Sequence, residues 1–101
     1  MSLLIHIMFE LDFSNIPDKL ASDILDEADE EFCEEYKVKV LHQSKYIILN
    51  GYDISMQTKV YEFVHNELEN KLYNEYAKEY TNQEIQDLID NGIIEISPTE
   101  E

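Results

Sequence analysis

The carboxylates of this chain are concentrated in one short segment. Eight acidic residues and no basic residue lie between positions 23 and 35, namely Asp23, Asp26, Glu27, Asp29, Glu30, Glu31, Glu34 and Glu35. Carboxylates without an adjacent base can bind cationic groups, such as the Lys and Arg side chains of another protein. The segment also holds apolar residues at helical spacing, so we predict a folded helix with one charged face.

Five of these carboxylates share one side of the predicted helix. At about 100° per residue, they lie opposite the apolar residues Ala21, Ile24, Leu25, Ala28 and Phe32. Carboxylates four residues apart are separated by about 6 Å along a helix axis, which is comparable to the spacing of phosphates along a nucleic-acid strand. We therefore expect a partner-binding face that consists of Asp23, Asp26, Glu27, Glu30 and Glu34.

The residue types that usually carry catalysis or bind cofactors lack suitable neighbours. His6, His42 and His65 form no closely spaced metal-binding motif. Gly51 and Gly92 are the two glycines, so the chain has no glycine-rich loop that could bind phosphate. We expect no catalytic residue, no metal and no cofactor, and we predict a protein that is not an enzyme.

The single cysteine, Cys33, cannot form an intramolecular disulfide. Its acidic neighbours disfavour the thiolate that a nucleophilic cysteine needs. We expect its side chain to be half-buried and chemically inert.

The composition limits the classes of partner. The chain has 101 residues and a formal net charge of −16, from 23 acids and 7 bases that are all lysine. This length suits a single domain over residues 1–101. The absence of arginine and the negative charge argue against direct nucleic-acid binding and against a phosphate-handling enzyme.

We find no targeting or membrane signal in the sequence. The N-terminal residues lack the positively charged region of a signal peptide. No apolar run approaches the roughly 20 residues that span a bilayer. We expect a cytoplasmic protein that does not associate with membranes.

Hydrophobic periodicity predicts four strands and three helices. The strands are expected over residues 3–11, 36–40, 45–50 and 93–96. The first helix is expected to have Pro17 in its first turn and to end near Glu34 or Glu35. The other two are expected from Met56 to about Tyr80 and from Asn82 to Asn91.

Polar residues mark the expected helix ends. Ser14 or Asn15 is predicted to cap the first helix and Ser55 the second. Thr81 and Glu84 match a capping box for the third helix, and Gly92 is a candidate left-handed stop.

The order β-α-β-β-α-(α)-β predicts an α+β fold of the split βαβ, ferredoxin-like type, with helices on one face of an antiparallel sheet. Residues 36–51 contain three lysines and no acid, so we expect this basic hairpin to offset the acidic helix. The apolar face of the long helix rotates along its length. This rotation predicts a bend near Asn66, or packing of the second half on the last helix or on another subunit. A homodimer through Leu72, Tyr73 and Tyr76 is one possible result.

The chain resembles the small acidic inhibitors that phages encode against host defence, including some anti-CRISPR proteins and DNA mimics. The resemblance is one of size, charge and a composition typical of low-GC genomes, rich in Asn, Ile, Lys, Tyr and Glu. It implies an inhibitor that occupies the cationic nucleic-acid-binding groove of an enzyme, in the cytoplasm of the host cell if a phage encodes it.

Three alternatives are consistent with the same residues. The acidic face could serve solubility alone, although repulsion of a few tenths of a kcal/mol per like-charged pair argues for a further use. The protein could be an immunity protein or antitoxin for a cationic toxin. It could also be a ferredoxin-like regulatory or assembly module whose open sheet face makes the contacts, through His6, Met8, Lys39, Tyr46 or Ile48.

Overall fold

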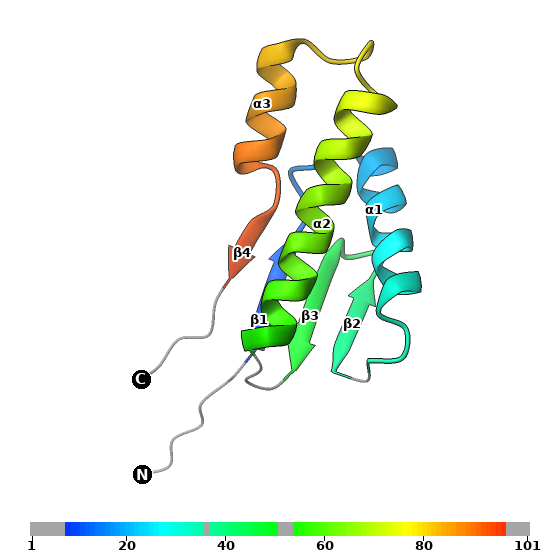
Figure 1. Ribbon diagram of the computed structural model, residues 1–101, viewed down its shortest axis with the longest axis vertical. Helices are drawn as coiled ribbons and strands as arrows, with labels where there is room; N and C mark the ends of the chain where they lie inside the picture. Colours follow the sequence, from blue (N-terminus) through cyan, green and yellow to red (C-terminus); the bar gives the residue numbers. More distant parts are fainter. Residues whose placement is uncertain (1–7, 36, 51–53, 97–101) are drawn as a thin grey trace.

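The computed structural model of the protein describes residues 8–35, 37–50 and 54–96 (Figure 1). The elements, in chain order, are β1 (Met8–Asp12), α1 (Asp18–Glu31), β2 (Val38–Leu41), β3 (Tyr46–Asn50), α2 (Ile54–Asn74), α3 (Asn82–Asn91) and β4 (Ile94–Ile96). The four strands form one antiparallel sheet in the order β2-β3-β1-β4. The fold is therefore α+β with a four-stranded antiparallel sheet and three helices, as the sequence predicted at that level.

One face of the sheet and the inner sides of the helices form the core. Alternate strand residues point to the same face, and on this face Phe9, Leu11, Ile47 and Leu49 are buried. Figure 1 shows α1 and α2 side by side over this face, with α3 beside the second half of α2. Each fully buried aliphatic or aromatic side chain contributes roughly 1.5–3 kcal/mol, so these apolar contacts hold the two layers together.

The first strand is only partly described. Residues 3–7 of the predicted strand lie outside the described residues, and β1 is described from Met8 onward. Leu11 pairs with Ile47 of β3 on one side and with Glu95 of β4 on the other. The short last strand is thus confirmed, and β1 lies inside the sheet.

The turn between β2 and β3 is attached to the start of α1. Lys45 has φ 63°, in the left-handed region that non-glycine residues seldom adopt. Its carbonyl accepts a hydrogen bond from the Phe13 N–H at 2.8 Å, and its amino group donates to the Ile16 carbonyl at 3.0 Å and to Asp18 at 2.7 Å. These three contacts hold the strained residue in place.

The predicted ends of α1 are wrong at both termini. Pro17, rather than Ser14 or Asn15, occupies the N-cap position, and no side chain caps the helix. The Ser14 N–H instead donates to the Asp12 carboxylate at 2.8 Å. The helix ends at Glu31, before the predicted end near Glu34 or Glu35, and its last turn has no basic residue. Negative side chains are unfavourable at the negative end of a helix dipole, which explains the early stop.

Because α1 ends at Glu31, Cys33 lies in the turn that follows the helix. Its side chain is exposed, so the expectation of a half-buried cysteine is wrong. The buried face of α1 continues only as far as Phe32, which is 8% exposed.

The long helix also differs from its prediction. It starts at Ile54, so Ser55 lies inside the first turn and is not the cap, and it ends at Asn74 rather than near Tyr80. The buried residues Val60, Val64, Leu68 and Leu72 follow one another at four-residue intervals along a continuous helix. Its second half packs against α3, which is one of the outcomes expected.

Two residues of the predicted dimer contact are buried within the single chain. Leu72 and Tyr76 are 0% and 5% exposed within the single chain, whereas Tyr73 is 52% exposed. Leu72 and Tyr76 are thus part of the core of the single chain, and of the three residues Tyr73 has an exposed side chain, so a homodimer contact here stays a prediction.

The capping box of α3 is confirmed. Thr81 accepts a hydrogen bond from the Glu84 N–H at 3.1 Å, and the Glu84 carboxylate accepts one from the Thr81 N–H at 2.8 Å. Gly92 ends the helix in right-handed conformation, so the predicted left-handed stop is wrong. A Cβ at Gly92 would collide with the Leu88 carbonyl and the Ile16 side chain, so close packing explains the glycine. In the described part of the chain, no helix has the length and hydropathy of a membrane span.

Candidate protein-interaction surface

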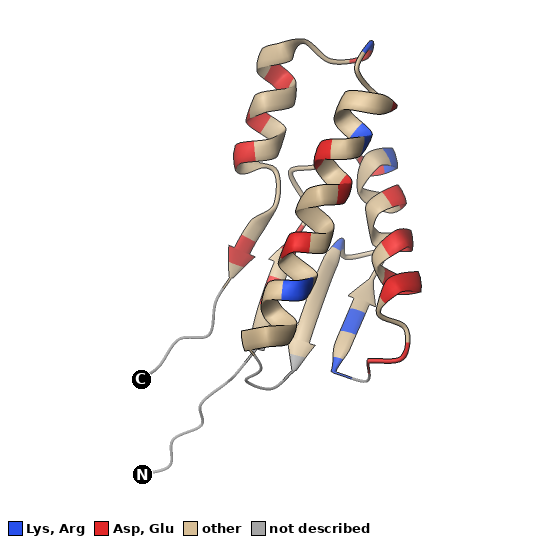
Figure 2. Ribbon diagram, in the orientation of Figure 1, with Lys and Arg blue, Asp and Glu red and all other residues tan. Residues whose placement is uncertain are grey.

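The acidic segment covers the outer side of α1 and the turn after it (Figure 2). The inner side of the helix is buried through Leu20, Ala21, Ile24, Leu25 and Ala28. The structure places Asp23, Asp26, Glu27 and Glu30 on the helix, as predicted, whereas Glu34 lies in the turn beyond its end. The five predicted contact residues therefore do not form one continuous helical face.

Glu27 is paired with a lysine of the neighbouring helix. The amino group of Lys71, on α2, lies 3.0 Å from the Glu27 carboxylate. It also lies 3.7 Å from Glu75 and 3.9 Å from Glu67. Lys71 is only 8% exposed, and a buried ammonium group requires such partners to stay charged. Glu27 thus contributes to the contact between the two helices.

The charged state of Lys71 is maintained by these carboxylates. Burial lowers the pKa of a lysine, because it disfavours the charged form. At Lys71 the hydrogen bond to Glu27 and the charges of Glu27, Glu75 and Glu67 outweigh burial, so the pKa of Lys71 is raised from its usual 10.5. Burial and the charge of Glu27 raise the pKa of Glu67 from its usual 4.5, against the opposing effect of Lys71.

Asp23 and Asp26 also have partners within the chain. The Tyr76 hydroxyl donates to Asp23 at 2.9 Å, and the Lys19 amino group lies 3.6 Å from the same carboxylate. Partial burial and the negative charge of Asp23 raise the pKa of Tyr76. Asp26 lies 2.9 Å from Nε2 of His42 in the turn after β2. These contacts tie α1 to the segment after α2 and to the hairpin.

Sequence analysis missed the two long-range partners of the acidic helix, Lys71 and His42. Lys71 follows Leu68 by three residues and Val64 by seven, so its spacing already put it on the apolar side of the long helix. This spacing was the available signal for a buried, paired lysine. The hairpin contributes as expected through Lys45, which pairs with Asp18 at 2.7 Å and lowers the pKa of that carboxyl.

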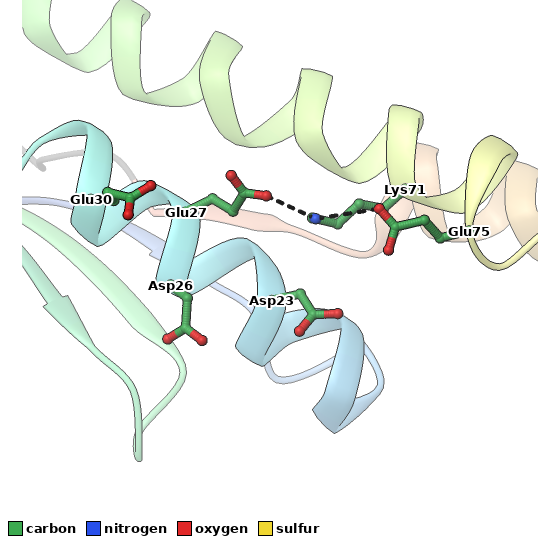
Figure 3. A pocket seen from close by; sticks show the side chains of 6 residues that line it. All are labelled: Asp23, Asp26, Glu27, Glu30, Lys71 and Glu75. Carbon is green, nitrogen blue, oxygen red and sulfur yellow. Dashed lines mark hydrogen bonds and ion pairs between the residues drawn. The ribbon is translucent and has the colours of Figure 1, made fainter.

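A hollow of about 400 Å³ lies between α1 and α2, and residues of the Lys71 and Asp23 contacts line it (Figure 3). Figure 3 shows Glu27 and Glu75 directed toward the Lys71 amino group, and the Asp26 carboxylate turned away from it. The lining residues are Asp23, Asp26, Glu27, Glu30, Lys71 and Glu75. Five carboxylates against one ammonium group give the hollow a negative potential that favours cationic groups.

The carboxylates at the end of α1 have a different environment. We define the acidic end as Asp29, Glu30, Glu31, Glu34 and Glu35, which are all exposed. In the described parts of the chain, none of these carboxylates takes part in the ion pairs or side-chain hydrogen bonds. Glu30 and Glu34 belong to the predicted face, whereas sequence analysis did not single out the other three.

The histidines do not come together into a ligand set. His42 pairs with Asp26, and His65 packs against the Tyr61 ring at a centroid distance of 4.2 Å. Burial lowers the pKa of His65, against the raising effect of the nearby Glu95 charge. His6 lies outside the described residues. Across residues 8–35, 37–50 and 54–96, no group of three or more His, Cys, Asp or Glu side chains is arranged to hold a metal ion.

Comparison of the chain with protein-family models, with curated protein sequences and with solved structures gives no match.

Proposed function

We propose that the protein is a non-enzymatic inhibitor that uses the acidic end of α1 to occupy a cationic surface of another protein. The observation that carries this proposal is the contrast within the acidic segment. Asp23, Asp26 and Glu27 have basic or hydroxyl partners within the chain, whereas the acidic end is exposed and has no ion pair or side-chain hydrogen bond among the described residues. Lys and Arg side chains of a partner would supply the missing positive charge.

The unfavourable position of these carboxylates supports a role in binding. Each negative side chain at a helix C-terminus costs about 0.3–1 kcal/mol, and each like-charged pair three or four residues apart costs about 0.2–0.5 kcal/mol. Asp26 and Glu30 are such a pair on α1, as are Glu27 and Glu31. A cationic partner would relieve this repulsion, and solubility alone does not require charges of one sign in one place.

The partner we propose is a nucleic-acid-binding enzyme of a bacterial defence system. Such enzymes have lysines and arginines that contact successive phosphates, and the exposed carboxylates of the acidic end would pair with these cations in place of phosphates. The net charge of −16 would speed association and make it sensitive to salt. The resemblance to phage-encoded inhibitors supports this class, and we propose that the protein acts in the cytoplasm of a host cell.

We also infer that the fold is of the ferredoxin-like, split βαβ type. β1 and β2 flank β3 and both run antiparallel to it, and β3 and β4 flank β1 in the same way. β1 and β2 are joined through α1, and β3 and β4 are joined through α2 and α3. α1 and α2 lie over the same face of the sheet (Figure 1). In this arrangement α1 and α2 lie side by side, which leaves the acidic end of α1 at the rim of the helical layer.

The proposal is tested by capture from a nuclease-treated lysate of a low-GC bacterium, with tagged protein, low-salt and high-salt washes, and identification of the captured proteins. We expect the protein to retain an enzyme that binds nucleic acid, and high salt to release it. The variant Glu30→Lys/Glu31→Lys should lose this capture. The variant Asp87→Lys/Asp90→Lys changes the net charge equally on exposed positions of α3 and should retain it.

The control separates the acidic end from the overall charge. Full capture by Glu30→Lys/Glu31→Lys would overturn the proposal. Equal loss of capture in both variants would show that the interaction depends on net charge alone. A small cationic toxin in the captured fraction would identify the protein as an immunity protein or antitoxin, which would use the same carboxylates.

A further inference from the structure

The face of the sheet that points away from α1 and α2 has its own chemical pattern. Strand alternation and the pairing register place two rows of side chains on it. The first row, from β2 to β4, is Lys39, Ile48, Glu10 and Ile96. The second row is Leu41, Tyr46, Asp12 and Ile94.

This face is more apolar than a solvated sheet surface. Leu41, Ile94 and Ile96 are 38%, 40% and 41% exposed, and Tyr46 and Ile48 are half-buried. The outer face of an antiparallel sheet is expected to carry polar side chains, but these five positions hold aliphatic or aromatic residues. Apolar side chains grouped on an exposed face are typical of an interaction site.

Two carboxylates lie in the middle of the apolar residues. Glu10 and Asp12 are half-buried neighbours on β1, between Ile48 and Tyr46 on one side and Ile96 and Ile94 on the other. The negative charge of Asp12 raises the pKa of Tyr46, with smaller contributions from partial burial and from Glu10. Lys39 is exposed on the outer strand β2, in the row of Glu10 with Ile48 between them. The centre of the face is therefore negative.

These charges distinguish between a second copy and a cationic partner. If two copies packed face to face, four carboxylates and two lysines would share one interface, because each copy brings Glu10, Asp12 and Lys39. Desolvated carboxylates in excess of cations are costly. A cationic segment with apolar side chains would instead match both the charge and the apolar residues.

We propose that this open sheet face is a second docking surface, which takes an amphipathic helix of a partner with leucine-like side chains on either side of a lysine or arginine. The apolar side chains would cover Leu41, Ile48, Ile94 and Ile96, and the cation would reach Glu10 and Asp12. The docked helix would add a third layer to the helix–sheet structure. This surface is independent of the acidic end, because α1 lies on the opposite face of the sheet (Figure 1).

The probe is a synthetic amphipathic peptide of leucine and lysine, about 18 residues or five helical turns long. A matched peptide with the same lysines and serine in place of leucine controls for charge. Binding to the full chain is followed by NMR, from the backbone amide shifts of the described strands and helices. We expect the leucine–lysine peptide to shift amides of β1, β3 and β4, and the serine–lysine peptide to leave these strands unchanged.

Variants then test the two carboxylates. Glu10→Gln/Asp12→Asn should weaken the leucine–lysine peptide at least tenfold, because it removes the charge partners in the middle of an apolar contact. Asparagine can still accept the Ser14 hydrogen bond, so we expect the fold to persist, and thermal unfolding checks this. Glu30→Gln/Glu31→Gln, which changes the charge equally at the acidic end, should retain the affinity within about twofold.

Several results would overturn this proposal. Shifts confined to α1, or equal binding of the serine–lysine peptide, would show attraction by charge alone. A dimer in analytical ultracentrifugation that dissociates in Ile48→Glu would identify a second copy as the occupant. Contacts from residues 1–7 to this face, measured by NMR, would identify the chain's own N-terminal segment. None of these results bears on capture through the acidic end.

Discussion

The two halves of the acidic segment contain the same kind of residue in different environments. Asp23, Asp26 and Glu27, toward the N-terminal side, contact Lys19, Tyr76, His42 and Lys71. The acidic end has no such contacts among the described residues. A carboxylate with an internal partner stabilises the fold, whereas an exposed carboxylate without one destabilises it slightly and is free to bind another protein. A dense acidic segment is thus two regions with separate roles.

The sharpest test of this difference is the substitution Lys71→Met. It leaves Glu27, Glu67 and Glu75 close together without their shared cation, and we expect a loss of about 2 kcal/mol in the free energy of unfolding. This estimate is at the low end for buried ion pairs because the Glu27 side chain is 44% exposed. Urea unfolding of Lys71→Met measures the loss, with Lys78→Met, at an exposed position, as the control. Equal stability of the two variants would mean that the paired half has no structural role.

Removal of one carboxylate from the same network should have a smaller effect. We expect Glu27→Gln to cost about 1 kcal/mol, because Lys71 loses its closest acceptor but keeps Glu75 and Glu67 nearby. The matched change Glu30→Gln lies on the same helix, at a carboxylate with no partner in the described part of the chain, and should leave the free energy of unfolding unchanged or slightly higher. A larger loss for Glu30→Gln than for Glu27→Gln would reverse the assignment of the two halves.

The ion pairs of Lys71 with the paired carboxylates should also make the free energy of unfolding depend on pH in the alkaline range. The pKa of Lys71 is raised from 10.5 in the folded protein, so its contribution is fully present below about pH 10.5 and is lost as the pH rises through the folded pKa. The free energy of unfolding should therefore decline faster for the native chain than for Lys71→Met over this range. Tyrosines with raised pKa values also lower stability there, but they do so in both proteins, so the difference isolates Lys71. Parallel declines would contradict the assignment.

The smallest effect is expected at the acidic end, with the opposite sign. Glu30→Lys/Glu31→Lys places cations at the helix C-terminus and removes like-charge repulsion, which should raise the free energy of unfolding by about 0.5–1 kcal/mol. The same variant should lose partner capture, so stability and binding should change in opposite directions. Thermal and urea unfolding of this variant and of Asp87→Lys/Asp90→Lys would measure the first part. A loss of stability specific to Glu30→Lys/Glu31→Lys would show that the acidic end has structural contacts.

Much of the fold was predictable because it depends on short-range patterns. Alternation in residues 3–11 and the apolar run in residues 46–49 predicted the two central strands, of which the first is described from Met8 onward. The Thr81–Glu84 spacing predicted the capping box of α3. Helix ends were less predictable. The early stop of α1 and the end of α2 at Asn74 depend on charge repulsion and on packing between helices, which periodicity does not describe.

The candidate site was predicted only in outline. The sequence located the acidic segment and two of the residues now assigned to the acidic end, Glu30 and Glu34. It also grouped Asp23, Asp26 and Glu27 with them, although the structure gives these three residues internal partners. The open sheet face was predicted through Lys39, Tyr46 and Ile48, which lie on it. His6 lies outside the described residues, and Met8 contributes its backbone to β1.

The sequence by itself determined the net charge of −16, the helical character of the acidic segment and the alternation that builds the sheet. These properties depend on residue type and on neighbours a few positions away. The tertiary structure decided which carboxylates are paired, because Lys71 lies 44 positions from Glu27 along the chain and meets it only where α2 packs on α1. Coulomb energy depends on distance in space and on burial rather than on position in the sequence.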